Sequence, residues 1–352
     1  MIQSRKSPSN THYPDLRSAF MLTLLAILAT LFTGVLFIGL GPLVAFGVGQ
    51  AIGVGAVATM AAQRVAQPQA ERIGLRPLDL DAIPVILCLA PAILLASELD
   101  NYAADWSAAA TEAPIEGDAV MKGNGGAEER ADQADYYDSL VDSQFEFDEP
   151  ADVEQEGFDS EAAGEGEENG MQVFGADDLW GLLQLAIVIV GIAPIVEEFF
   201  FRGVIQQGLV ARMGMLRGVA FTALLSTLAR PVNVSDPARF FAAAVAFFAL
   251  GWVLGIVRIA TRSVLGSMLL ASTWAAAGVG SLALQGKMDL PGMNVEGTHL
   301  PWVVTAVSAL LVGWAGWTLY QEALHGGSPR RDDLSGPPPP VVPLQPPGRP
   351  RS

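Results

Sequence analysis

The chain has 352 residues, 51% of them hydrophobic, with a mean hydropathy of +0.37 and a formal net charge of −17. Together with apolar runs approaching twenty residues, this composition predicts an integral, multi-pass membrane protein and excludes a soluble globule. Nucleic-acid binding has no support in such an acidic chain. Apolar runs in a bilayer must be helical, because each backbone polar group needs an internal partner, and the alternation of a membrane barrel is missing. We therefore expect an all-α polytopic helix bundle.

The negative charge is concentrated in one segment of the chain. Residues 98–178 hold 25 acidic and two basic residues, which leaves 12 acidic and 18 basic residues elsewhere. The segment is rich in Ala, Gly, Asp and Glu and poor in branched apolar residues, so it cannot bury enough surface to offset the cost of ordering. We expect a disordered acidic loop, 98–178, attached to a mildly basic membrane body.

Three membrane spans are expected before this loop, within residues 19–97. A polar N-terminal segment, 1–18, precedes them. Residues 19–62 carry no charge and are long enough for two spans. The break between the two falls at three helix-breaking residues: Gly39, Gly41 and Pro42. A third, shorter span covers about 82–97 and contains the single cysteine, Cys88, which excludes an intramolecular disulfide and a cysteine-based metal site.

Five further spans are expected after the loop. They lie at about 179–201, 215–230, 238–257, 264–285 and 301–321. The first four form a membrane core, 179–285, and residues 286–325 hold the last loop and the last span. The tail, 326–352, is rich in proline and is expected to be extended or disordered.

About eight spans place both termini on one side of the membrane. Basic residues gather on that side, at these positions: Arg5, Lys6, Arg17, Arg64, Arg72, Arg76, Arg202, Arg212, Arg217, Arg258, Arg262, Arg330 and Arg331. By the positive-inside rule, both termini are cytoplasmic and the acidic loop is external. We expect a bacterial-type plasma membrane.

A Glu-Glu-Phe-Phe-Phe-Arg run, Glu197 to Arg202, places three ionisable side chains at the end of an apolar segment. Charges at membrane depth are costly and usually face a protein interior or a wet cavity, where they serve a function. Glu198 and Arg202 are four residues apart and share a helix face, while Glu197 is rotated by about 100°. One arrangement has Arg202 holding Glu198 while Glu197 points into the bundle. In the alternative, an interfacial ion pair closes the helix and Arg202 reaches the cytoplasm.

The segment around this run, Ile195-Val-Glu-Glu-Phe-Phe-Phe-Arg-Gly-Val-Ile, resembles the EExxxR motif of the CPBP intramembrane protease family. That family includes type II CAAX prenyl proteases and bacteriocin self-immunity proteins. Residues Phe248-Ala-Leu-Gly251-Trp-Val-Leu-Gly255 match its FxxGxxxG run, and the resemblance covers roughly 180–285. It implies a metal-dependent, zinc-type peptidase. In such a site the first glutamate is the general base for a metal-held water, and the second glutamate and two histidines surround the metal.

The chain departs from this family at both histidine motifs. The FxxxH motif falls on Ser226 to Arg230, and the HxxxN pair falls on Ala271 and Ala275, with Ser272 and Ala276 as the alternatives. A metal hydrolase needs at least three firm ligands and an open position for water. Arg230 is a permanent cation and cannot ligate a metal. We therefore expect no metal, and hypothesise that Arg230 replaces it as the positive partner of the Glu pair. In the alternative, Arg230 extends to the external headgroups.

The three histidines, His12, His299 and His325, all lie outside the apolar segments. A Ser-His-Asp site in the membrane is therefore excluded, and His299 is expected to be an ordinary loop residue.

Three functions stay open. The first is a non-catalytic family member, a scaffold or a binder of transmembrane or lipidated protein segments. The second is an active intramembrane metallopeptidase with atypical ligands. The third is a channel or transporter in which Glu197 and Glu198 line an ion path, and the scarcity of other charges in the spans counts against it. The oligomeric state is open.

Overall fold

The computed structural model describes residues 13–112, 179–230, 236–295 and 297–325. Most of the N-terminal segment, most of the acidic loop and the Pro-rich tail lie outside these ranges, so the expectations of disorder there are not addressed. The chain divides into one unit of residues 1–107 and 174–352 and a second unit of residues 108–173. Only 108–112 of the second unit are described, and they continue a helix. The described residues are helical, with a single isolated β-bridge.

The first two spans form where the sequence predicts them. Helix α1 (Leu16–Leu36) begins at Asp15, whose carboxylate accepts a 2.9 Å hydrogen bond from the Ser18 backbone N–H. A short 3₁₀ turn, η1 (Ile38–Leu40), and Gly41 at φ +100° then reverse the chain. The second span is continuous from α2 (Pro42–Val48) through the π-helical η2 (Gly49–Val54) to α3 (Gly55–Ala62).

The third span is longer than expected. After α4 (Gln69–Ile73), η3 (Leu80–Ala82) and α5 (Ile83–Leu87), helix α6 runs over Ala92–Glu112. Residues 98–112 are therefore helical, and the boundary placed at 98 is wrong. The acidic residues there have partners: Glu98 accepts a 2.9 Å hydrogen bond from the Leu300 N–H, and Asp100 pairs with Arg239 at 2.7 Å. The acidic composition predicted a loop because the partners of Glu98 and Asp100 lie far away in the sequence and cannot be recognised from composition.

The fourth span also extends past its predicted end. Five segments form one helix of 35 residues, Leu179–Met213. They are α8 (Leu179–Leu185), the π-helical η5 (Ala186–Ile192), α9 (Ala193–Glu198), the π-helical η6 (Phe199–Ile205) and α10 (Gln206–Met213). Gly214 at φ +83° ends it. Arg202 therefore lies within the helix and does not close it.

The remaining helices are α11 (Met215–Leu228), α12 (Pro237–Thr261), α13 (Val264–Leu284) and α14 (Trp302–His325). Asp236 and Ser263 cap α12 and α13 by accepting backbone N–H bonds. Seven helices within the described residues are long and apolar enough to cross a membrane. The remaining predicted span, 215–230, corresponds to α11, which has 14 residues and is about 21 Å long, shorter than the hydrocarbon core of about 30 Å.

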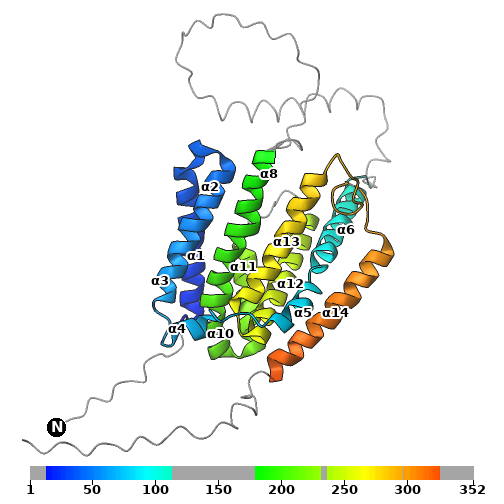
Figure 1. Cartoon of the computed structure of the whole chain (residues 1–352). Coiled ribbons are helices and arrows are strands. Elements are labelled where there is room, and N and C mark those ends of the chain that lie inside the picture. Colours follow the sequence, from blue (N-terminus) through cyan, green and yellow to red (C-terminus); the bar gives the residue numbers. More distant parts are fainter. Residues whose placement is uncertain (1–12, 113–178, 231–235, 296, 326–352) are drawn as a thin grey trace, which may run out of the picture. The chain divides into compact units, whose positions relative to one another are not determined.

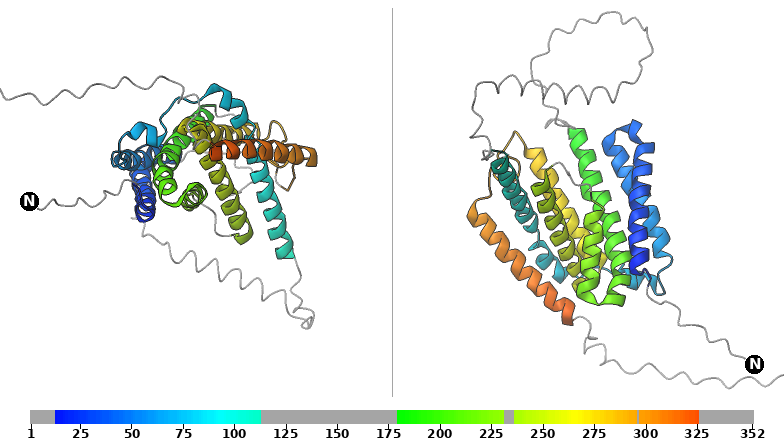
Figure 2. Two further views of the ribbon diagram at one scale, coloured as in Figure 1. Left: turned by 90° about the horizontal axis from the view of Figure 1, so that it is seen from below. Right: turned by 180° about the vertical axis from the view of Figure 1, so that it is seen from behind.

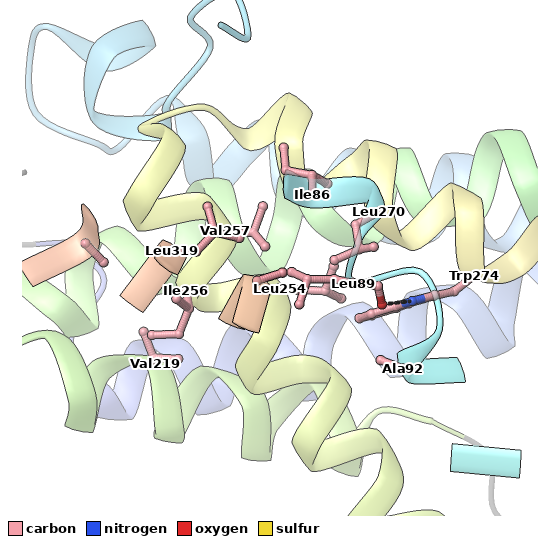
Figure 3. Packing of buried hydrophobic residues seen from close by; sticks show 12 residues of the cluster. Ile86, Leu89, Ala92, Val219, Leu254, Ile256, Val257, Leu270, Trp274 and Leu319 are labelled. Atoms are coloured by element: carbon pink, nitrogen blue, oxygen red, sulfur yellow. Dashed lines mark hydrogen bonds between the residues drawn. The ribbon is translucent and has the colours of Figure 1, made fainter. Parts of the chain in front are cut away.

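Within the larger unit the helices stand side by side, with α1–α3 flanking the long α8–α10 helix and α14 packed on α12 (Figures 1 and 2). One apolar cluster joins α1 and α3 to η6, α10 and α11. A second joins α5 and α6 to α12, α13 and α14. In the second, Trp274 donates its indole N–H to the Leu89 carbonyl at 3.2 Å (Figure 3). Helix α13 contacts η5 and α9 of the long helix directly.

Candidate functional site

The first element of the candidate site is a buried ion pair within the long helix. Arg202 Nη1 donates to Glu198 Oε1 at 2.8 Å, and the two side chains are only 2% and 1% exposed. This confirms the arrangement in which Arg202 holds Glu198. The alternative of an interfacial pair at a helix end is wrong, because the helix continues to Met213 and Arg202 is enclosed.

The face of the long helix that carries Arg202 packs against the two glycines of the FxxGxxxG run. Arg202 Nη2 donates to the Gly251 carbonyl at 3.1 Å, and Gln206 Nε2 donates to the Gly255 carbonyl at 2.8 Å. A Cβ at Gly255 would lie 2.7 Å from Val219 Cγ1, and one at Gly251 would lie 3.1 Å from the Ser226 hydroxyl. Close approach of α12 therefore requires Gly255, whereas a side chain at Gly251 would shift its neighbours by a few tenths of an ångström. The sequence reading missed Gln206, although it continues the four-residue spacing of Glu198 and Arg202.

The second ion pair joins α11 to α9. Arg230 Nη2 donates to Glu197 Oε2 at 2.9 Å, with Arg230 41% and Glu197 20% exposed. The guanidinium carbon also lies 5.2 Å from the centre of the Phe247 ring, within cation–π distance. Glu197 is the 19th of 35 residues in the long helix, so this pair lies near the middle of that helix. Arg230 pairs with the Glu-Glu motif rather than extending away from it.

All the sequence-predicted positions converge on one cavity of about 250 Å³. It is lined by Glu197, Glu198, Arg202, Arg230, Ala271 and Ala275, together with Ser226 and apolar side chains from α2, α6, η5, α12 and α13. The alternatives Ser272 and Ala276 are not among the lining residues. The cavity therefore combines two carboxylates, two guanidiniums and an otherwise apolar wall.

This donor set does not fit a catalytic zinc ion. Zinc sites use at least three firm nitrogen, sulfur or carboxylate ligands. The cavity offers two carboxylates, each already bonded to an arginine, and its lining holds no histidine or cysteine. Across the described residues, no three His, Cys, Asp or Glu side chains are grouped to hold a metal. Cys88 is a free thiol in the second apolar cluster, away from these carboxylates.

A separate polar cluster involves His299, in the loop before α14. Its Nδ1 lies 2.9 Å from Glu98 Oε1 and its Nε2 lies 2.8 Å from Asp105 Oδ2, both on α6. Tyr102 stacks on the ring at a centroid distance of 4.6 Å. Hydrogen bonds to Asp105 and Glu98 raise the pKa of His299. His299 is thus a bridge between the loop and α6, not an ordinary loop residue.

One segment of the chain is similar to a known protein family. Residues 179–277 match the family model described as type II CAAX prenyl endopeptidase Rce1-like. The segment is an Rce1-like domain. Neither the curated proteins nor the solved structures gave a match to the chain.

The Rce1-like segment contains all the charged residues that line the 250 Å³ cavity. It runs from the start of α8 into α13 and so includes both glutamates, Arg202, Arg230, the two glycines of α12, Ala271 and Ala275. With seven described helices long and apolar enough to cross a membrane, the chain is a multi-pass membrane protein that contains this Rce1-like segment. The N-terminal helices α1–α6 and helix α14 lie outside the matched segment.

Proposed function

We propose that this protein is a non-catalytic Rce1-like membrane protein that binds a transmembrane or lipidated segment of another protein. The observation that carries the proposal is the Arg230–Glu197 ion pair. In this pair a guanidinium is bonded to a carboxylate to which the family resemblance assigns a role in the metal-dependent reaction. A permanent cation there competes with Zn²⁺ for the same oxygen atoms. We expect no zinc cofactor.

The Glu198–Arg202 pair supports the same conclusion. Both side chains are enclosed, and Arg202 is bonded to the Gly251 carbonyl as well as to Glu198. The second glutamate of the family motif would help to surround the metal, whereas Glu198 already has one oxygen fixed by an arginine. The pair therefore acts as a structural cross-link between the long helix and α12.

Two adjoining cavities support binding of an apolar segment. Besides the 250 Å³ cavity, a second of about 380 Å³ lies among α1, η2 and α11, and the Glu197–Arg230 pair lines both. Most of the remaining wall of the second cavity is apolar, including Phe200, Phe201 and Leu228. An apolar wall with a few polar groups is typical of a ligand site. A lipidated or transmembrane segment fits such a wall better than a soluble peptide does.

A fluorescent farnesylated CAAX peptide tests this function on the purified protein in nanodiscs. Fluorescence anisotropy should show saturable binding, and mass spectrometry should show an uncleaved peptide. Ala275→Leu fills the cavity and should weaken binding about tenfold, which corresponds to a loss of about 1.4 kcal/mol in binding free energy. Ala276→Leu, at an exposed position of the same helix, is the matched control and should bind like the wild type.

Two results would overturn the proposal. Peptide cleavage that a chelator abolishes would show an active metallopeptidase with atypical ligands. Binding that does not saturate, or that Ala275→Leu and Ala276→Leu alter equally, would show that the cavity is not the binding site.

A further inference from the structure

A cavity lined by arginines lies at the end of the bundle where α4 and α10 are found (Figure 1). Its volume is about 450 Å³. Four arginines line it, Arg72, Arg202, Arg258 and Arg262, and they come from α4, η6 and the end of α12. We call it the basic cavity. It is distinct from the cavity at Ala271 and Ala275, although Arg202 borders both.

The basic cavity gathers positive charge without a carboxylate in its wall. None of the described residues that line it is acidic. Arg202 is paired with one carboxylate, that of Glu198, which lines the 250 Å³ cavity and not the basic cavity. Arg72 and Arg262 make further interactions, whereas Arg202 and Arg258 each keep a buried donor that a bound anion would satisfy.

Two of the arginines retain buried donors. Arg202 Nε and Arg258 Nε are both enclosed and have no hydrogen-bond partner, and Arg202 as a whole is only 2% exposed. Leaving a buried donor unsatisfied costs about 1–3 kcal/mol, more when the group is charged. Such donors in a lined cavity indicate a ligand or water that completes them.

The Arg258 side chain is held in place by the backbone around α4. Its Nη2 donates to the Arg72 carbonyl at 3.0 Å. Its guanidinium lies against Gly74, where a Cβ would come within 2.7 Å of three guanidinium atoms. Gly74 has φ +85° and its carbonyl accepts a 2.9 Å bond from Val264 N–H, which ties α4 to the start of α13. A guanidinium fixed in this way is ready to receive an anion without further ordering.

We propose that the basic cavity binds a phosphate group that carries an apolar or organic remainder. The guanidinium fork matches phosphate oxygens, and several arginines together bind a dianion better than a monoanion. The volume exceeds that of inorganic phosphate, and the rest of the wall includes Val210, Met215 and Ile259. The cavity lies at the ends of α10, α12 and α14, where a lipid headgroup is within reach. Either a phospholipid or a soluble phosphomonoester has the required chemistry.

The test compares the two sources on the full-length protein. Retention of phosphatidylglycerol is measured by native mass spectrometry after purification from nanodiscs of phosphatidylcholine with or without phosphatidylglycerol. Protection by inorganic phosphate or glycerol phosphate is measured as the shift of the thermal unfolding midpoint in detergent. Retained phosphatidylglycerol identifies a lipid site, and protection by glycerol phosphate at millimolar concentration identifies a soluble ligand.

Variants assign the binding to the cavity. Arg258→Gln and Arg262→Gln should each weaken binding about tenfold, whereas Arg217→Gln, an arginine near the same end that does not line the cavity, should leave it unchanged. If Arg258→Gln fails to fold, Arg262→Gln carries the test alone. The proposal is overturned if neither probe binds, or if Arg217→Gln weakens binding as much as the cavity variants do.

Discussion

Arg230 Nη2 lies 2.9 Å from Glu197 Oε2, so the cation at the end of α11 is bonded to the first carboxylate of the Glu-Glu motif. The neighbouring carboxylate, Glu198, is bonded to Arg202 at 2.8 Å. Each glutamate thus has its own arginine, and the four charges balance one another. This pairing distinguishes the site from one that needs a metal ion to neutralise its carboxylates, and the predictions below depend on it.

Breaking the buried pair should destabilise the fold strongly. Arg202→Met leaves Glu198 buried without its counter-charge, and we expect a loss of about 3–5 kcal/mol in the free energy of unfolding. Glu198→Gln likewise leaves Arg202 buried without its counter-charge. The double variant Glu198→Gln/Arg202→Met removes both charges and should recover part of the loss. Chemical unfolding in detergent measures all three, and additive losses in the double variant would contradict the pairing.

The glycines of α12 should differ sharply from a glycine in open space. Gly255→Ala brings a methyl group within 2.7 Å of Val219 Cγ1, so we expect a loss of about 1–3 kcal/mol from overpacking. Gly278→Ala on α13 meets nothing within 4 Å and serves as the control. It should be neutral or slightly stabilising, because alanine is the better helix former. Thermal unfolding midpoints distinguish them, and equal effects would show that α12 does not pack as described.

The loop before α14 should become less firmly attached as pH rises. Hydrogen bonds to Asp105 and Glu98 raise the pKa of His299, which favours its charged form in the folded protein. The stabilisation is therefore complete below the ordinary histidine pKa of about 6.5 and is lost as pH rises through the higher folded value. The protection factors of the 286–301 backbone amides, which correct the exchange rates for the base catalysis of exchange itself, should fall as pH rises across this range. His299→Asn should abolish the pH dependence; if the dependence persists in that variant, His299 is not its source.

Restoring histidines should create a zinc site. The variant Arg230→His/Ala271→His replaces one competing cation and adds a second imidazole to a cavity that already holds two carboxylates. We expect it to bind about one equivalent of zinc, measured by calorimetry on the purified protein. Arg230→His/Ala276→His places the second imidazole at an exposed position and should bind zinc more weakly. Equal affinities would mean that the cavity does not form the site.

The sequence predicted the parts of the site whose chemistry is local. The i,i+4 spacing of Glu198 and Arg202 predicted their ion pair, and Gly251 and Gly255 predicted close helix contact. The convergence of Arg230 and Ala271 on the glutamates followed from the positions of the family motifs. The membrane helix bundle followed from hydropathy, because lipid permits few alternatives.

Other features depended on partners that sequence order does not show. Helix α6 continues past residue 98 because Glu98 and Asp100 find partners two hundred and about 140 residues away. The charge of Arg202 allowed an interpretation as the end of a helix at the membrane surface. Arg202 is instead buried, because it bonds both Glu198 and the Gly251 carbonyl. The basic cavity is formed by arginines from three separate segments, which the sequence places only on the same side of the membrane.

Metal content tests the central claim most directly, because a guanidinium already occupies one oxygen of each carboxylate that would serve a zinc site. The full-length protein is purified without chelator from cells supplied with zinc, and its metal content is measured by inductively coupled plasma mass spectrometry beside Glu197→Ala. We predict far less than one zinc per chain in both, with no difference between them. One zinc per wild-type chain that is lost in Glu197→Ala would contradict the account and restore a metallopeptidase site.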